Sequence, residues 1–433
     1  IVVILCFAGI LGVGYYFSKT SQDMDSFYKA NRSLPWSLCV GTLMASWYGG
    51  AGVVGTVGYA TTMGFSAFFI WSIGAHAVRF PLALWIAPRI SVKAKATIPD
   101  LLRANYGKPA AVLGAIAIVV TCLSIGEIAA VGYVGEGAWH ANKFVVAIIV
   151  VAVSIAITCM GGLMGVAVTD MIFFFLMVTC VSAAFPQLFF SMGGFEGIKE
   201  ALSGPAPEML TAFGGTPIPQ AIILIVLCIN IYKDPTFYQR FASANSAKTG
   251  KRAMLTCFSI WLSFDVVTIM CGVLIRVYDV NLTTQPEVTY ISLIVGTLGA
   301  IVSTLDSYYL IGGEIISNDI IYMLRGDRPL KDKTSIRITR IASVCFGIIG
   351  LLTAFRFARV YDAFLFLTSI SMTLLFVPMM AALVYDGKKT NVAGLSSMIV
   401  GAVGWIVFQY ICPITISGIQ IDPVLIGLPL SFI

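Results

Sequence analysis

The sequence predicts an all-α protein that crosses a membrane many times. Hydrophobic residues make up 58% of the 433 residues and charged residues 11%, whereas a soluble domain carries about 25% charged residues. Apolar windows of about 20 residues, the length that spans a bilayer as a helix, recur along the whole chain. Lipid must therefore be the solvent for most of the surface, which excludes a soluble domain and a protein with a single anchor.

Thirteen spans are expected in chain order. The first begins inside an apolar run without the basic region and the cleavage site of a signal peptide, so we interpret it as a membrane helix clipped at its start. The longest windows are expected to include ends outside the bilayer. The spans are 1–18, 34–62, 65–88, 109–139, 144–161, 163–190, 217–241, 250–278, 289–323, 334–355, 360–385, 391–412 and 421–433.

The distribution of positive charge supports this order of spans. If the 19–33 loop is cytoplasmic and the loops alternate, twenty of the 27 Lys and Arg residues, Arg240 among them, fall on the cytoplasmic side and four on the other. The positive-inside rule then predicts a multi-pass protein of the cell membrane with an outside N-terminus and its last residue on the cytoplasmic side. The net charge of +6 is therefore explained by the orientation of the protein in the membrane. The lipid bilayer is the expected surrounding, with no nucleic-acid partner, and the chain is expected to be a monomer or weak oligomer.

Six charged residues within the expected spans are candidates for a site. A charge at mid-membrane costs at least ~2.5–3.5 kcal/mol, so such residues usually line a site or a pathway. Two interpretations stay open for the adjacent Lys233 and Asp234, which either compensate each other or face a solute, and Asp265 is interpreted as structural. The six are Glu127, Asp170, Lys233, Asp234, Asp265 and Asp306.

The second span, in MASWYGGAGVVGTVGY, is unusually rich in glycine. Glycine lowers helix stability and permits unwinding, although small residues also allow close helix packing. Packing needs one stripe of small residues, whereas Gly49, Gly50 and Gly52 fall on different faces within one turn. The pattern therefore predicts a helix broken at mid-membrane, whose freed carbonyl groups line a cavity and can coordinate a cation.

The ninth span carries a polar stripe in GAIVSTLDSYY, residues 299–309. Ala300, Ser303, Thr304 and Ser307 have the i, i+3, i+4, i+7 spacing of one helix face. A single hydroxyl often bonds the carbonyl one turn earlier, but a row of hydroxyl oxygens opposite a broken helix suits a hard cation. Sodium is the expected ion, because its single charge can be held by carbonyl and hydroxyl oxygens without a carboxylate.

With these features, the chain resembles the sodium:solute symporter family over nearly its whole length. The matching stretches are DSFYKANRSLPW with ASWYGG, TIPDLLRANYG, GGLMGVAVTD, FYQRFASANSAKTGKRA, and STLDS with SNDIIY. The resemblance implies the LeuT-type fold, an inverted repeat of five plus five helices with flanking helices. We expect one transporter domain over 1–433, with a leading helix and loop at 1–33, repeats at 34–190 and 217–385, and C-terminal helices at 391–433.

The resemblance also implies where ions bind. Its shared sodium site uses carbonyls of the first repeat helix and a carbonyl and two hydroxyls of the eighth, which here are Ala45, Tyr48, Ala300, Ser303 and Thr304. Some members hold an accessory sodium with an Asp on the fifth repeat helix. The corresponding residues here are Asp170, Asp306 and Ser307, near Ser303, with Asp306 standing where some members have Ser.

Within the family, ASWYGGAGVVGT and Glu127 are most similar to the choline-transporter branch, whose aromatic cage binds a quaternary ammonium by cation–π contacts. Trp47 matches one cage residue, but Ala130 and Thr236 occupy the other tryptophan positions, so choline itself is not expected. The stretch between Asp279 and Gly299 also looks short for the family. The solute is expected beside the break, contacting Trp47, Tyr48, Gly50, Glu127, Tyr232 and Lys233.

The sequence therefore predicts a sodium-coupled symporter that imports a small organic solute by alternating access. An amine or amino acid is the preferred solute, because acids outnumber bases among the candidate site residues and Trp47 and Tyr48 add π-faces. A sodium/sugar or sodium/carboxylate symporter and a sensor that feeds a cytoplasmic signalling domain are the alternatives. An enzyme is not expected, since the sequence contains no nucleophile–base motif.

Overall fold

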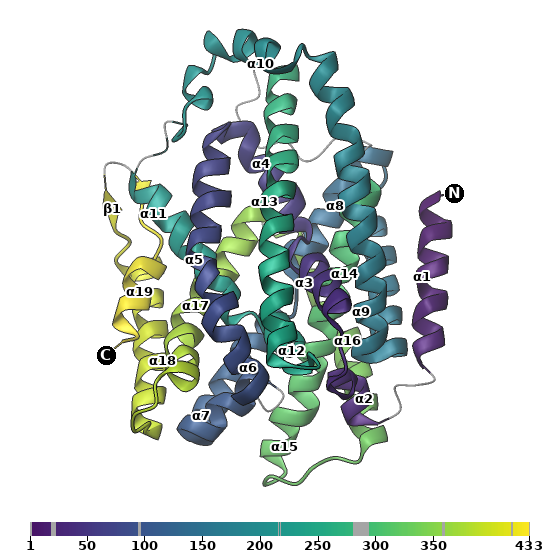
Figure 1. Ribbon diagram of the computed structural model, residues 1–433. Helices are drawn as coiled ribbons and strands as arrows, with labels where there is room; N and C mark the ends of the chain where they lie inside the picture. Colours follow the sequence, from purple (N-terminus) through teal and green to yellow (C-terminus); the bar gives the residue numbers. More distant parts are fainter. Residues whose placement is uncertain are drawn as a thin grey trace.

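The computed structural model describes residues 2–18, 23–93, 97–214, 216, 218–279, 294–356, 360–416 and 419–432. The described chain is helical apart from loops and the two-residue strands β1 (Thr415–Ile416) and β2 (Ile419–Gln420), which pair antiparallel. Most of the stretch between Asp279 and Gly299, which the sequence suggested is short, lies outside these residues. Figure 1 shows the long helices running roughly alongside one another, as in a membrane bundle.

The first half of the bundle follows the predicted spans, with breaks inside them. A φ of +54° at Gly162 interrupts α9 at the expected boundary between the fifth and sixth spans. The fourth span is not one helix, because Ser124 takes a φ of +49° and separates α7 from α8. The elements are α1 (Val2–Ser18), α2 (Met24–Lys29), η1 (Ala30–Arg32), α3 (Trp36–Trp47), α4 (Gly50–Met63), η2 (Phe68–Gly74), α5 (Ala75–Pro81), η3 (Leu82–Ile86), α6 (Ala87–Lys93), α7 (Ile98–Thr121), α8 (Ile125–Trp139), α9 (Lys143–Ser191), α10 (Gly194–Ser203) and η4 (Pro207–Leu210).

The second half contains another helix that changes direction. Residues Ala221–Lys233 and Pro235–Ser243 meet at a bend of 42°, where Pro235 cannot donate the backbone hydrogen bond that a continuous helix needs. The elements are α11 (Ile218–Leu227), η5 (Cys228–Lys233), α12 (Pro235–Ser243), α13 (Ala247–Tyr278), α14 (Ile294–Glu314), η7 (Ile315–Ile320), α15 (Ile321–Leu324), α16 (Asp332–Ala354), α17 (Val360–Val384), α18 (Asn391–Ile406), η8 (Val407–Ile411) and α19 (Val424–Leu430).

Within the described residues, seven helices are long and apolar enough to cross a membrane, or nine if each bent pair is one span. Thirteen spans therefore stay a prediction. Large apolar side chains on the outer faces are exposed, among them Ile148 and Ile149 on α9 and Ile348 and Ile349 on α16. Such continuous apolar surface suits contact with lipid acyl chains rather than water.

The helix α14, which carries the predicted hydroxyl stripe, lies inside the bundle and packs against α3, α9 and α16. Its residues Ala300, Ser303 and Thr304 are at most 3% exposed. The interior placement explains the composition of the stripe, since a hydroxyl can enter an apolar core only where it finds a polar partner. Those partners come from α3 and α9.

Candidate sodium and solute site

The predicted break in the second span is present. Helix α3 ends at Trp47, Tyr48 leaves helical geometry (φ −86°, ψ 51°), and α4 starts at Gly50. The segments Trp36–Trp47 and Gly52–Met63 are bent by 51°. The last carbonyl groups of α3 therefore have no partner one turn further along the same helix, and they face α14.

Oxygen atoms of α3 and α14 converge at this break. The Thr304 hydroxyl oxygen lies 3.4 Å from the Ala45 carbonyl oxygen, 3.3 Å from that of Ser46 and 3.0 Å from that of Ala300. The hydroxyl can give its hydrogen to Ala300 and still offer a lone pair to a cation. We call the five residues predicted from the sequence, Ala45, Tyr48, Ala300, Ser303 and Thr304, the oxygen cage. These distances bring together three of them, Ala45, Ala300 and Thr304.

Ser303 is the cage member that faces another group. Its hydroxyl donates to the Asp170 carboxylate on α9 at 2.6 Å, and both residues are fully buried. The Ser46 carbonyl, which the sequence did not single out, lies as close to Thr304 as the predicted Ala45 does. The Ser46 carbonyl could have been found from the sequence, because Ser46 precedes Trp47 in the last turn of α3, where carbonyl groups lose their helical partners.

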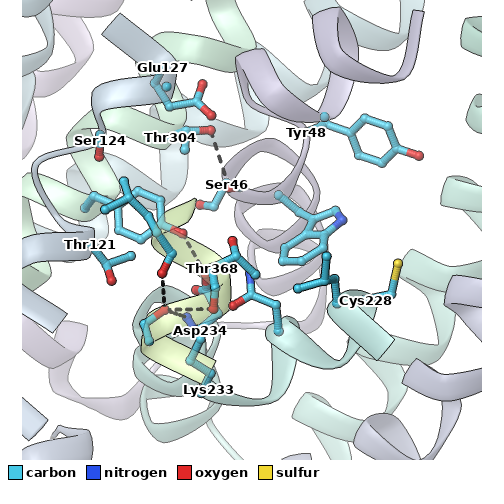
Figure 2. A pocket seen from close by; sticks show the side chains of 18 of the residues that line it. Ser46, Tyr48, Thr121, Ser124, Glu127, Cys228, Lys233, Asp234, Thr304 and Thr368 are labelled. Atoms are coloured by element: carbon cyan, nitrogen blue, oxygen red, sulfur yellow. Dashed lines mark hydrogen bonds between the residues drawn. The ribbon is translucent and has the colours of Figure 1, made fainter. Parts of the chain in front are cut away.

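Glu127 lies at the same break, on the first turn of α8. Its carboxylate accepts a hydrogen bond from the backbone N–H of Gly50, the first residue of α4, where the helix dipole favours negative charge. A Cβ atom placed on Gly49 would lie 2.5 Å from a Glu127 carboxylate oxygen and 2.6 Å from the Thr304 hydroxyl oxygen. Figure 2 shows Glu127 and Thr304 side by side.

The acids Asp170 and Asp306 form a second buried polar cluster with Arg240. Thr42 donates to Asp170, and a guanidinium nitrogen of Arg240 lies 3.5 Å from an Asp170 carboxylate oxygen. The same guanidinium nitrogen donates to the Ser307 hydroxyl at 2.5 Å. Ser307 in turn lies 3.4 Å from an Asp306 carboxylate oxygen. The predicted accessory residues are thus brought together, with an arginine among them.

Arg240 corrects an assumption in the topology map, which counted it among the cytoplasmic loop residues. Its side chain is fully buried and also donates to Thr42 and Gln239. The other oxygen of Asp306 is buried without a hydrogen-bond partner within the described residues. One cation and two ionised acids give this cluster a formal charge of −1, which is costly in a buried site unless a further cation or a proton compensates it.

A cavity adjoins the oxygen cage between the two bent helices. The wall includes Trp47, Tyr48, Glu127, Lys233 and Thr304, so two residues of the cage, Tyr48 and Thr304, also face the cavity. Figure 2 shows Glu127 and Thr304 at the top of the view and Lys233 and Asp234 at the bottom. Other lining residues include Ser46, Thr56, Trp71, Arg79, Thr121, Ser124, Asn230, Asp265, Tyr308, Thr368 and Ser371.

Two of the predicted solute contacts do not line this cavity. The Tyr232 hydroxyl donates to the Val78 carbonyl at 2.9 Å, and its ring borders a separate groove against Phe376. Gly50 is not among the lining residues, and its N–H is directed to Glu127, which is. Sequence spacing alone could not separate these residues from their neighbours Lys233 and Trp47.

Asp265 has the structural surroundings expected from the sequence. It accepts hydrogen bonds from the Tyr48 hydroxyl, from Ser72 at 2.5 Å and from His76 at 3.1 Å. Three donors satisfy a carboxylate well in an apolar setting. This acid therefore fixes the Tyr48 side chain beside the break, which orients the residue whose carbonyl belongs to the oxygen cage.

The Trp47 ring is covered by protein groups. The Arg79 guanidinium lies 4.8 Å from its centroid, and Phe237 contacts it edge-on at 5.5 Å. Arg79 itself is 5% exposed and donates to the Cys228 carbonyl at 3.2 Å. Because an arginine already makes the cation–π contact, one face of Trp47 is closed to a quaternary ammonium. The sequence gives no local sign of this contact, because Trp47 and Arg79 belong to different helices, α3 and α5.

Two bent helices that enclose a cavity, beside a cage of carbonyl and hydroxyl oxygens, define the class of cation-coupled secondary transporters. More particularly, the chain belongs to the sodium:solute symporter family, whose sequence model matches residues 27–286. It is a multi-pass membrane protein that couples the movement of a small solute to Na⁺, and it is not an enzyme.

Relatives in this family are distant, and the similarity covers about three quarters or more of their length. The high-affinity proline transporter PutP of Bacillus subtilis is 22% identical, over 91% of this chain and 88% of the relative. The osmoregulated proline transporter OpuE of the same organism is also 22% identical, over 80% and 75% of the two chains. Sodium/proline symporter 2 of Staphylococcus saprophyticus is 22% identical, over 81% and 74%.

Solved structures give the fold. A Na⁺-coupled sialic acid symporter in a substrate-bound outward-open state superposes with a TM-score of 0.82, covering 100% of this chain and 95% of that one at 18% identity. Mhp1, a nucleobase-cation-symport-1 family transporter, superposes with a TM-score of 0.60 over 95% and 94% of the chains at 13% identity. The LeuT-type fold expected from the sequence is confirmed.

Proposed function

We propose that Na⁺ binds in the oxygen cage and that an amino-acid-like solute binds in the adjoining cavity. The observation that carries this assignment is the position of Thr304, whose hydroxyl oxygen lies within 3.4 Å of carbonyl oxygens of both α3 and α14. Carbonyl and hydroxyl oxygens contributed by two helices match the preference of a hard cation.

Thr304 also explains how ion and solute are coupled. It belongs to the oxygen cage and to the cavity wall, so an ion that draws α3 and α14 together also fixes one wall of the solute cavity. A ligand shifts a conformational equilibrium only by its difference in affinity between the two states. Sodium that bridges the two helices in one state raises solute affinity in that state, and linkage requires the reverse as well.

The ends of the cavity support an amino-acid-like solute over a simple amine. Glu127 stands at one end and Lys233 at the other, a polarity that suits a zwitterion. The Arg79 contact with Trp47 removes the aromatic face that a bare ammonium would use. Two of the relatives are named as proline transporters, which also supports an amino acid as the solute.

We also propose repeats at 34–190 and 217–385, because each range begins with a bent helix, α3–α4 in the first and α11–η5–α12 in the second. The positive-charge bias supports an outside N-terminus.

For the cluster around Asp170, we propose a second sodium. The Asp306 oxygen without a partner and the formal charge of −1 support it. Wild type is expected to show a sodium Hill coefficient above one for uptake, and Asp170→Asn to lower it towards one, because the variant removes the charge that the second ion compensates. Asp332→Asn, at an exposed position on α16, is the control. A wild-type coefficient of one would remove the second ion.

Sodium-driven uptake into proteoliposomes tests the proposed function. The panel consists of radiolabelled L-proline, L-alanine, lactate, N-acetylneuraminate, glucose and choline, each with an inward gradient of sodium or of potassium. We expect at least one amino acid or its analogue to accumulate with sodium and not with potassium. Accumulation of glucose alone, or of choline alone, would contradict an amino-acid-like solute.

A further inference from the structure

The cavity has a basic end whose cation lacks an acidic partner. Lys233 is the last residue of η5 and is 3% exposed, and its Nζ donates to the Ser371 hydroxyl on α17 at 2.6 Å. Within the described part of the chain, no carboxylate oxygen lies within 4.0 Å of this nitrogen. An ammonium carries three N–H donors, so the Ser371 contact leaves donors that can turn to a ligand.

The neighbouring acid does not fill this role, because its oxygens are directed elsewhere. One Asp234 oxygen accepts from the backbone N–H groups of Thr236 at 2.8 Å and Phe237 at 3.1 Å, which caps α12. The other accepts from the Tyr308 hydroxyl at 2.6 Å. Of the two interpretations that the sequence left open, mutual compensation is therefore not supported by a contact, and Lys233 extends across the bend towards α17.

The other acids of the cavity wall are also bound by protein donors. Asp265 accepts from Ser72, His76 and Tyr48, and Glu127 accepts from the N–H of Gly50 at the opposite end of the cavity. The second cation of the wall, Arg79, stacks on Trp47. A buried ammonium without an anion in direct contact is costly in a low-dielectric site, so the wall is complementary to a ligand that brings a negative charge to Lys233.

Ser371 holds Lys233 in this position. Its hydroxyl hydrogen is directed to the Leu367 carbonyl at 2.6 Å, so its oxygen is left to accept from the lysine. A lysine fixed by one neutral acceptor keeps its charge available and loses less freedom when a ligand binds. Lys233 is thus positioned to bind an oxyanion and does not form an ion pair with an acid among the described residues.

We propose that the solute carries a carboxylate group and that Lys233 binds this carboxylate at the end of the cavity opposite Glu127. This rests on the proposed function, since it assigns the orientation of the solute in the same cavity. The remainder of the solute then extends towards Glu127 and Thr304, where an amino group would meet the acid. A simple amine, a sugar or a polyol offers no anionic partner to Lys233.

The solute side is tested on the unaltered protein with matched pairs that differ in one group. L-proline is compared with L-prolinamide, L-alanine with L-alaninamide, and lactate with lactamide, by sodium-dependent thermal stabilisation and by competition with uptake. We expect any carboxylate that the protein recognises to bind about 10- to 100-fold more tightly than its amide, the range for one charge-assisted hydrogen bond. Equal affinity for both members of a pair overturns the proposal.

The protein side is tested with Lys233→Met and Lys233→Arg. Lys233→Met should reduce the preference for carboxylate over amide about 10- to 100-fold, while sodium still stabilises the protein in the absence of solute. Lys233→Arg should restore much of the preference, because it returns a cation. The control is Lys248→Met, at an exposed position on α13. A purely structural role for Lys233 would weaken acid and amide together.

The two proposals fail in different ways. If glucose or choline accumulates with sodium and no carboxylate does, the carboxylate assignment is wrong while sodium coupling stands. A variant Lys233→Met that keeps the wild-type preference for carboxylate likewise overturns the carboxylate assignment alone. If no member of the panel accumulates with sodium, the proposed function fails, and the assignment of the solute fails together with it.

Discussion

Gly49→Ala is expected to abolish sodium-driven uptake. Gly49 has a φ of −68°, which alanine adopts freely, so backbone strain is not the cause. The added Cβ would lie 2.5 Å from a Glu127 oxygen, 2.6 Å from the Thr304 hydroxyl oxygen and 2.7 Å from the Glu127 carboxyl carbon. Separations this short require the break to open or Glu127 and Thr304 to move, and a displacement of about 1 Å at a site can cost about 100-fold in activity.

Gly55→Ala is the matched control, because it lies on the same helix α4 and its added Cβ would have no atom within 4 Å. It should retain uptake and gain slightly in stability, since alanine is preferred over glycine in a helix interior by about 1 kcal/mol. Both variants are measured by initial uptake rate and by thermal unfolding in detergent. Wild-type uptake by Gly49→Ala would show that the break is not where the ion and solute meet.

Thr304→Val is expected to raise the sodium concentration for half-maximal uptake about 10- to 100-fold. Valine keeps the shape and apolar volume of threonine and removes one cage oxygen, and a hydrogen bond or ligand contact to a charged group contributes about 1.5–3 kcal/mol. The measurement is the sodium dependence of uptake, together with sodium-dependent thermal stabilisation of the purified protein.

Thr297→Val, two turns earlier on α14, is the matched control. The Thr297 hydroxyl is buried without a hydrogen-bond partner within the described residues, so its removal should leave sodium dependence unchanged and stability equal or higher. If Thr304→Val retains the wild-type sodium dependence, sodium binds outside the oxygen cage. If both variants shift it equally, the effect belongs to α14 packing and not to the ion.

The broken helix and the hydroxyl stripe could be predicted because each depends only on the sequence of a short segment. Three glycines on different faces of one turn destabilise any continuous helix, and the spacing of Ala300, Ser303 and Thr304 fixes a face whatever the fold. The contacts of 3.3–3.4 Å between the two segments depend on tertiary packing, for which the family resemblance supplied the expectation.

Arg240 was missed because a cation near the end of an apolar window is the usual sign of a loop. Its burial follows from the bend at Pro235, which directs α12 into the bundle next to Asp170 and Ser307. Likewise, the partners of Lys233 and Asp234 could not be read from adjacency, since one contacts α17 and the other caps α12. The break at Ser124 has no strong local signal, because serine commonly occupies helix interiors in membranes.

The most direct test of sodium coupling through the oxygen cage is a reciprocal binding measurement on the purified protein. The solute Kd is determined with and without saturating sodium, and the sodium affinity with and without saturating solute, using the solute identified by the uptake panel. Because the two sites share Thr304, both affinities should change by the same factor, and Thr304→Val should bring that factor towards one. A solute Kd that is independent of sodium in wild type would contradict the coupling.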